Sequence, residues 1–275
     1  MMSNVMDKFS LAGKTAVVTG GAGLLGKQFT LTLAQAGALV VIADLNLELA
    51  LQQAERIKSN GFDAIALAVD VTDPDSTRQM VNEIIRSTGR LDILINNAAL
   101  DPKFEPQNFN GLADNSFETY PLQAWRDSLE VNLTGIFLVT QAAVIPMLKQ
   151  EKGVVINICS IYGLVGPDQR IYKIPGETRK FKPVDYSVTK AGVLGLTHYL
   201  ASYYANTNIR VNALSPGGIF NEHGDEFVKN YSARTILGRM ANIDELNGAI
   251  LFLASDASSY MTGANLVVDG GWTAW

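Results

Sequence analysis

The chain alternates short runs of β-branched, apolar residues with longer amphipathic stretches along most of its 275 residues. Each run is nearly all apolar, which is typical of a strand buried on both faces of a parallel sheet. Predicted strands cover residues 15–19, 39–43, 64–69, 91–95, 154–159, 209–214 and 265–268. Strands that alternate with helices in this way predict an α/β fold with a doubly wound parallel sheet.

Amphipathic stretches between the strands predict the helices of this fold. Predicted helices cover residues 25–36, 47–59, 74–87, 122–149, 184–205 and 243–254. Asp73 and Pro74 have the chemistry of a helix start, and Gly37 and Gly61 fall where two helices should end. No repeat, low-complexity tract or linker interrupts the pattern. We therefore expect a single Rossmann-type domain over residues 1–275, with helices on both faces of its sheet.

Composition narrows the class of protein. A formal net charge of −5 gives no electrostatic reason to expect a nucleic-acid or membrane partner. The single cysteine, Cys159, cannot form an intrachain disulfide, and the opening residues MMSNVMDKFSLAGK do not resemble a signal peptide. No uninterrupted run reaches the roughly 18 apolar residues of a membrane span. We expect a cytoplasmic protein, and no His, Cys and Asp cluster has the spacing of a metal site.

A glycine-rich segment, TGGAGLLG at residues 19–26, follows the first predicted strand and runs into a helix. Glycines permit a tight turn and a close approach of the backbone to a pyrophosphate, while the helix start offers free N–H groups. Gly21, Gly23 and Gly26 also match the spacing G-x-G-x-x-G. The alternative interpretation is an ordinary strand-to-helix turn. The position between strand and helix favours a dinucleotide site.

Asp44 closes the second predicted strand, 18 residues after Gly26. A carboxylate there accepts hydrogen bonds from the ribose hydroxyls of NAD and repels the 2′-phosphate of NADP. The neighbouring residues 43–46 (ADLN) contain no cation. We therefore expect NAD rather than NADP as the cofactor, the alternative being that Asp44 only caps the next helix.

Tyr186 and Lys190 place a phenol and an ammonium four residues apart on one face of a helix. A free tyrosine ionises near pH ~10, which is too high for a good base at neutral pH. A neighbouring cation favours the phenolate. The pair alone could equally be part of a solvated helix face, so its meaning depends on the other motifs.

Taken together, the motifs resemble the short-chain dehydrogenase/reductase family from about residue 14 to residue 272. The segments that carry the resemblance are TGGAGLLG at 19–26, DV at 70–71, NNAA at 96–99, VNLTG at 131–135, NICS at 157–160, YSVTK at 186–190, RVNALSPGG at 210–218 and VDGGW at 268–272. The glycine loop departs from the family's commoner branch, because Leu24 stands at its middle glycine. Asn221 stands where a threonine often contacts the nicotinamide amide.

The resemblance implies four catalytic residues. Tyr186 would be the general acid/base, and Lys190 would lower the pKa of Tyr186 and bind the nicotinamide ribose. Ser160 would hydrogen-bond the substrate oxygen, and Asn132 would hold a water that relays protons. The implied cofactor site consists of Gly20, Gly21, Gly23, Leu24, Leu25, Gly26, Asp44, Leu45, Asp70, Val71, Asn96, Asn97, Ala98, Tyr186, Lys190, Pro216, Gly217, Gly218 and Ile219.

Two segments without a clear period, at about residues 100–121 and 163–183, follow predicted strand ends. Ser160 and Tyr186 lie 26 residues apart, where the family usually has about a dozen intervening residues. The first insertion holds the aromatic residues Phe104, Phe109, Phe117 and Tyr120, and the second holds the cations Arg170, Lys173, Arg179, Lys180 and Lys182. We expect the substrate to contact Ser160, Tyr162, Arg170 and Lys173. The alternatives are an oligomer contact and a solvated basic face.

These features predict an NAD-dependent enzyme that interconverts a secondary alcohol and a ketone on a sugar, amino sugar or sugar phosphate. The inserted loops resemble bacterial dehydrogenases of surface-glycan and flagellin-glycan synthesis. The alternatives are a reductase of a 3-oxoacyl thioester or another small ketone, and a catalytically silent NAD-binding regulator. The resemblance also implies a homotetramer, formed through the helices at 122–149 and 184–205.

Overall fold

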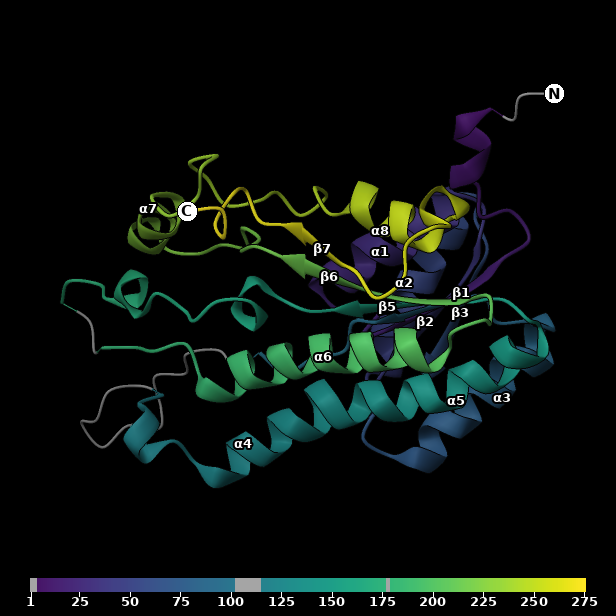
Figure 1. The fold of residues 1–275 in the computed structure, drawn as a ribbon, viewed down its shortest axis with the longest axis horizontal. Coiled ribbons are helices and arrows are strands. Elements are labelled where there is room, and N and C mark those ends of the chain that lie inside the picture. Colours follow the sequence, from purple (N-terminus) through teal and green to yellow (C-terminus); the bar gives the residue numbers. More distant parts are fainter. Residues whose placement is uncertain (1–3, 102–114, 177–178) are drawn as a thin grey trace.

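The computed structural model describes residues 4–101, 115–176 and 179–275. Its centre is one sheet of seven parallel strands in the order β3-β2-β1-β4-β5-β6-β7 (Figure 1). The strands are β1 (Thr15–Thr19), β2 (Leu39–Asp44), β3 (Ala64–Ala68), β4 (Ile93–Asn96), β5 (Gly153–Ile158), β6 (Ile209–Pro216) and β7 (Asn265–Val268). The predicted doubly wound parallel sheet is confirmed.

Helices cover both faces of the sheet (Figure 1). One face carries α1 (Leu24–Gln35), α2 (Leu47–Ser59) and α8 (Asn247–Ala254). The other face carries α3 (Pro74–Thr88), α4 (Leu122–Leu129), α5 (Gly135–Lys149) and α6 (Val184–Tyr203). A further helix, α7 (Asp225–Ser232), lies beyond the carboxyl ends of β6 and β7, near the C-terminus.

The two faces of the sheet bury separate apolar cores, which explains why the strands are apolar at nearly every position. Along β1, Ala16 and Val18 pack into the core under α1 and α8. Val17, between them, packs into the opposite core under α3 and α5. All five residues of β1 are buried, so an alternating polar pattern would have placed uncompensated polar groups in one core.

The expected helix ends are present. The Asp73 carboxylate accepts a hydrogen bond from the Asp75 N–H at the start of α3, where Pro74 is the first helical residue. Gly37 and Gly61 have φ angles of +98° and +83°, values that favour glycine, and each follows the end of a helix.

Three features of the helices differ from the prediction. The helix at 122–149 is continuous, but residues Glu130–Thr134 form a π-helical turn between α4 and α5. Helix α8 begins at residue 247 rather than 243. Helix α7 was missed, because it is only eight residues long and its apolar face consists of Phe227, Val228 and Tyr231 alone. The spacing of apolar residues predicts which face of a helix is buried, but it does not reveal a single π-helical turn such as the one between α4 and α5.

The helical stretch at 122–149 is long and apolar enough to cross a membrane by length and composition alone. However, 56% of its most apolar window is buried inside the protein, against α3 and the sheet. This burial is typical of a core helix in a globular domain.

The strand order places a crevice at the carboxyl ends of β1 and β4. Strands β2 and β3 lie on one side of β1 in the sheet, and strands β4 to β7 lie on its other side. The loops that follow β1 and β4 therefore separate to opposite faces, and open α/β sheets bind ligands at such a point.

Candidate active site

A cleft of about 800 Å³ opens at the carboxyl ends of the strands. Its predicted cofactor-site residues are Gly20, Gly23, Leu24, Leu25, Asp44, Leu45, Asp70, Val71, Asn97, Ala98, Tyr186, Pro216, Gly217, Gly218 and Ile219. The cleft is also lined by Ser160 and Tyr162. Residues far apart in the sequence thus form one continuous wall.

The glycine loop between β1 and α1 is shaped by close backbone contacts. Gly20 has a φ of +60°, and a Cβ at Gly26 would lie 2.1 Å from the Gly20 carbonyl oxygen. Gly26 is therefore buried beneath the loop and allows the first turn of α1 to pack against it. Gly23 is the N-cap of α1 and no side chain caps the helix, so its first N–H groups remain available. This cradle fits the pyrophosphate of a dinucleotide.

Asp44 lies at the end of β2 and links the glycine loop to the next helix. Its Oδ2 accepts a hydrogen bond of 3.0 Å from the Ala22 N–H, and its Oδ1 accepts one of 3.0 Å from the Asn46 N–H. The N-cap of α2 is Asn46, whose side chain accepts from the Leu49 N–H. Asp44 is therefore not the helix cap, and its carboxylate lines the cleft where a cofactor ribose would bind.

The two asparagines after β4 have different environments. Asn97 lines the cleft, and its Nδ2 donates to the carbonyl oxygens of Thr19 and Gly20. Asn96 is 2% exposed, and its Nδ2 donates instead to Thr140 and Asn157. Asn96 thus joins β4 to α5 and β5, and the structure does not bring it to the cleft where a ribose contact was expected.

Ser160 and Tyr186 line the cleft, and Lys190 is buried next to Tyr186 without lining it. Ser160 lies two residues after the end of β5, and its Oγ accepts from the Tyr162 N–H and lies next to Tyr186. Lys190 lies one turn after Tyr186 on α6 and is 3% exposed. Its Nζ donates a hydrogen bond of 2.9 Å to the Ile158 carbonyl and lies 5.7 Å from the centre of the Tyr186 ring.

The electrostatics of this cluster differ from the expectation in one respect. Burial raises the pKa of Tyr186, the Asp101 carboxylate raises it further, and the neighbouring Ser160 hydroxyl lowers it. The lowering of the Tyr186 pKa that was expected from Lys190 is outweighed, because burial removes more hydration from a phenolate at this position than the neighbouring groups replace. Burial also lowers the pKa of Lys190 to about 8. The phenol is therefore held in its protonated form, while the lysine changes charge close to neutral pH.

Asn132 lies in the π-helical turn and is buried beside the cluster. Its Oδ1 accepts from the Leu100 N–H at 2.6 Å, and its Nδ2 donates to the Leu100 carbonyl at 2.9 Å. A weaker contact of 3.4 Å reaches Thr189 of α6. Asn132 thus fixes the chain after β4 against α6. Single π turns occur frequently at functional sites, where they re-aim a side chain.

The second insertion does not place its predicted cations at the cleft. The side chain of Arg170 is 82% exposed and pairs with Asp168 at 2.8 Å, and Lys173 is also exposed. Neither residue lines the cleft. The reason is a short 3-10 helix, Gln169–Tyr172, which turns Tyr172 inward and the basic side chains outward. Lys182, further along the same insertion, does line the cleft.

The first insertion is described only in part. Phe104 and Phe109 lie outside the described residues. Phe117 is 75% exposed, and Tyr120 precedes α4.

Several cleft residues were not identified from the sequence. They include Asp101, Tyr172, His223, Phe227 and Tyr231. Lys182 and Asn221, two residues already noted in the sequence, also line the cleft. His223 lies in the loop before α7, where its ring stacks on Phe227 and its Nδ1 accepts from the Asn221 N–H. The available signal was position, because the segment at 217–231 follows the carboxyl end of β6.

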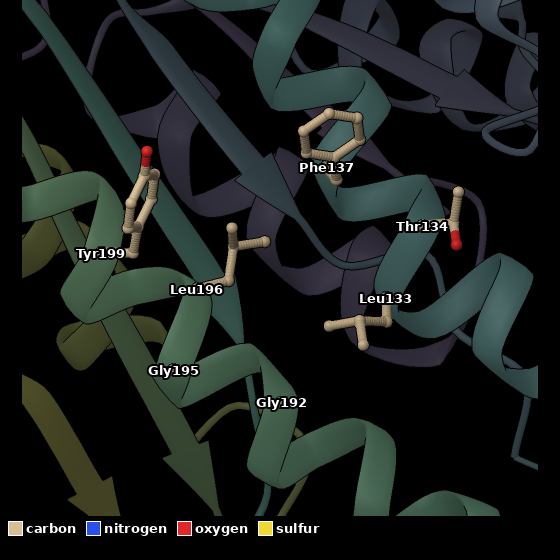
Figure 2. Close-up of a pocket in the computed structure, with 7 residues that line it drawn as sticks. All are labelled: Leu133, Thr134, Phe137, Gly192, Gly195, Leu196 and Tyr199. Carbon is tan, nitrogen blue, oxygen red and sulfur yellow. The ribbon is translucent and has the colours of Figure 1, made fainter. Parts of the chain in front are cut away.

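A separate apolar groove of about 440 Å³ lies on the outer surface of α5 and α6. Figure 2 shows the side chains of Leu133, Thr134, Phe137, Leu196 and Tyr199 around it, with Gly192 and Gly195 on α6. Phe137 and Tyr199 are 48% and 63% exposed. The groove is built from residues other than those of the cleft.

Comparisons with known proteins agree with this geometry. A family model described as "Enoyl-(Acyl carrier protein) reductase" matches residues 21–273. A 3-oxoacyl-(acyl-carrier-protein) reductase, FabG, of Thermotoga maritima is 36% identical, and the match covers 95% of this chain and 98% of that protein. The trans-4-hydroxycyclohexanecarboxylate dehydrogenase of Sinomonas cyclohexanicum is 38% identical, with 99% and 97% covered. The crystal structure of a gluconate 5-dehydrogenase from Burkholderia cenocepacia J2315, in complex with NADP and tartrate, superposes with a TM-score of 0.86 at 32% identity, covering 99% of this chain and 100% of that one.

Proposed function

This chain belongs to the short-chain dehydrogenase/reductase family of oxidoreductases, and we propose that it interconverts a secondary alcohol and a ketone with NAD as the cofactor. The observation that carries the proposal is that Ser160 and Tyr186 lie next to each other in the wall of a cleft that continues to the glycine loop. This arrangement supports an acid/base group, a hydroxyl for the substrate oxygen and a dinucleotide cradle that act along one cleft.

The roles of the residues follow from their positions. The dinucleotide, when bound, supplies or accepts the hydride. The Tyr186 hydroxyl donates a proton to the substrate oxygen during reduction and takes it back during oxidation. The Ser160 hydroxyl holds that oxygen beside the phenol, so that the proton transfer needs little reorganisation. The Lys190 side chain, when protonated, favours the phenolate form of Tyr186 and offers a hydrogen-bond donor to the cofactor ribose.

A preference for NAD over NADP rests on Asp44. Its carboxylate lines the cleft beyond the glycine loop, where it would meet the 2′-phosphate of NADP, and residues 43–46 offer no cation to balance that charge. The Burkholderia cenocepacia protein, with its bound NADP, shows that this fold also accepts the phosphorylated cofactor. The preference must therefore be measured with both cofactors.

The substrate half of the cleft is aromatic and polar, which supports a small, ring-shaped, hydroxylated substrate such as a sugar, amino sugar or sugar phosphate. The named relatives add hydroxycyclohexanecarboxylate and gluconate to the compounds worth testing. A second candidate, reduction of a 3-oxoacyl thioester, is favoured by the match to the Thermotoga maritima enzyme.

We also propose a symmetric oligomer, expected to be a tetramer, in which the apolar groove of Figure 2 packs against a second copy. Its supporting observation is the exposed apolar surface on neighbouring helices, including Phe137 and Ile145 on α5 and Tyr199 and Tyr203 on α6. Large exposed apolar patches mark interaction surfaces, and closed symmetric assemblies bury them. The single cysteine, Cys159, which is buried and unpaired, supports a cytoplasmic location.

The test is a substrate screen with the purified protein. NAD and NADP are each supplied with sugars, sugar phosphates, gluconate and trans-4-hydroxycyclohexanecarboxylate, and cofactor reduction is followed by absorbance. The reverse reaction is assayed with 3-oxoacyl thioesters and the reduced cofactors. We expect turnover of an alcohol with NAD that Tyr186→Phe removes. Turnover that survives this substitution, or a chain that binds neither cofactor, would contradict the proposal.

A further inference from the structure

Lys182 has an unusual environment for a lysine. Its side chain is 12% exposed, it lines the cleft, and its ammonium lies 3.9 Å from the centre of the Tyr186 ring. Lysine ammonium groups are strongly hydrated and are usually kept in water, even where the aliphatic stem is covered. The Lys182 charge is instead held over the aromatic ring that performs the proposed proton transfer.

Asp101 is the carboxylate that faces this ammonium. Its Oδ1 lies 2.5 Å from Lys182 Nζ, and it also lines the cleft. The two residues come from different insertions, one after β4 and one before α6. The exposures of the partners are unequal, because the Asp101 side chain is 56% exposed. Because Asp101 is the exposed partner, a substrate carboxylate can replace it while the Lys182 ammonium stays in place and remains paired.

The position of Lys182 at the start of α6 also favours an anion. The helix begins at Val184, so the ammonium lies beside the positive end of the helix dipole. A lysine at this end is unfavourable by itself and gains from any negative group bound next to it. Among the described residues that line the cleft, Lys182 is the only lysine or arginine.

Aromatic rings form the wall beside this charge. Tyr162 and Tyr172 share a hydrogen bond of 3.1 Å between their hydroxyls, and Tyr172 packs on Phe227 with ring centres 5.5 Å apart. Phe227 stacks in turn on His223. This wall offers flat apolar faces with polar edges, which suit a compact ring that carries hydroxyl groups. The ammonium of Lys182 lies over the ring of Tyr186 and lines the same cleft as this wall.

We propose that Lys182 is a specificity-determining residue that binds a carboxylate of the substrate, which takes the place of Asp101. The substrate class is then a compact cyclic or polyhydroxylated hydroxy acid, oxidised at a secondary alcohol close to its carboxylate. A carboxylate is favoured over a phosphate, because one ammonium matches one negative charge and the group that it binds in the structure is itself a carboxylate. The inference rests on the proposed function and names the substrate class of that same cleft.

The kinetic test compares each carboxylate with its uncharged carboxamide. Hydroxycyclohexanecarboxylates and sugar acids are assayed beside their carboxamides and beside sugar phosphates, with wild type, Lys182→Met and Lys182→Arg. Lys182→Met should lower the ratio of kcat/KM for carboxylates to kcat/KM for carboxamides about tenfold or more, mainly through KM for the carboxylates, because any effect on proton transfer at Tyr186 is common to both kinds of substrate. Lys182→Arg should restore part of the loss. Asp101→Asn, which removes the competing charge, should lower KM for the carboxylates.

Lys152→Met is the matched control. Lys152 also pairs with an aspartate, Asp256, at 3.0 Å, but it precedes β5 and lies at the opposite end of the strands from the cleft. Its removal should change none of these constants.

A measurement without turnover separates this inference from the proposed function. Calorimetry compares cyclohexanecarboxylate with cyclohexanecarboxamide on the full chain saturated with NAD. We expect the carboxylate to bind at least about tenfold more tightly to wild type and equally weakly to Lys182→Met. Equal affinity of wild type for both compounds would overturn the inference, even if alcohols are oxidised. The inference would also be overturned if Lys182→Met lowered kcat/KM equally for carboxylates and carboxamides, or lowered it only for sugar phosphates. Carboxylate binding without oxidation of any alcohol would refute the proposed function alone.

Discussion

The ammonium of Lys190 donates a hydrogen bond of 2.9 Å to the backbone carbonyl of Ile158, the last residue of β5. This bond ties α6 to the strand that Ser160 follows. Tyr186, one turn before Lys190, is thereby held next to Ser160, although the two are 26 residues apart in the chain. The candidate active site is therefore positioned by a strand end and a helix face, both of which are rigid elements.

Replacing Tyr186 by phenylalanine tests the acid/base assignment. The ring and its packing remain, but the proton-carrying hydroxyl is removed, so kcat should fall about 100- to 10,000-fold. NAD affinity, measured by fluorescence titration, should change less than about threefold. Tyr260→Phe, at a fully exposed tyrosine, is the control and should retain wild-type turnover.

Lys190 predicts a specific dependence of stability on pH. Burial lowers its pKa from 10.5 to about 8, so between these values the unfolded chain binds a proton that the folded chain has released. Unfolding free energy therefore rises with pH across this window, by about 3 kcal/mol for this group. Below pH ~8 both states are protonated and the full cost of burying the charge remains.

The measurement is urea denaturation of wild type and Lys190→Met at several values between pH 7 and 10.5. The unfolding free energy of wild type should rise relative to that of the variant as pH rises. Taking the difference between the two proteins removes the contribution of the tyrosines, which both proteins contain. A difference that does not vary with pH would show that the ammonium is not desolvated in the folded chain.

Gly26→Ala should damage the dinucleotide cradle. The added Cβ would lie 2.1 Å from the Gly20 carbonyl oxygen, so the loop must move away from α1. We expect NAD affinity to fall about tenfold or more, together with a loss of stability of about 1–3 kcal/mol. Gly248→Ala is the matched control, because that helical glycine has no atom within 4 Å of an added Cβ. It should leave NAD affinity unchanged and slightly raise the melting temperature.

Asp44→Asn should narrow the preference between the two cofactors. The asparagine keeps an oxygen that can accept from Ala22 or Asn46, but the negative charge is removed. The Kd for NADP should therefore fall about tenfold, while that for NAD rises only a few-fold. Isothermal titration with both cofactors measures these changes. If wild type already binds NADP as tightly as NAD, the assignment of Asp44 as the discriminating residue is wrong.

Phe137→Glu should separate the proposed oligomer. The ring is 48% exposed in the groove of Figure 2, and a carboxylate buried there against a second copy would be unpaired. Light scattering should report an oligomer for wild type and a smaller species for the variant. Lys58→Glu, on the opposite face of the sheet, should leave the assembly intact. A monomeric wild type at micromolar concentration would contradict the proposal.

The sequence by itself determined the layered fold and the positions of the main motifs. Seven strands and most helices could be predicted, because strand burial on two faces imposes apolar residues at successive positions. The glycine loop, Asp44 and the pair Tyr186–Lys190 were recognisable, since their spacing follows from a strand-to-helix turn and from one helical repeat.

The tertiary structure alone decided which polar residues face the cleft. Asn96 and Asn97 are adjacent, but Asn96 ends β4 and is buried against Thr140 and Asn157, so only Asn97 reaches the wall. Among the basic residues of the second insertion, a short helix turned Arg170 outward, while the approach of Asp101 drew Lys182 inward. The pKa of Tyr186 likewise depends on how much water the assembled cleft excludes. Burial and charge pairing arise between segments distant in the chain, so local spacing carries no record of them.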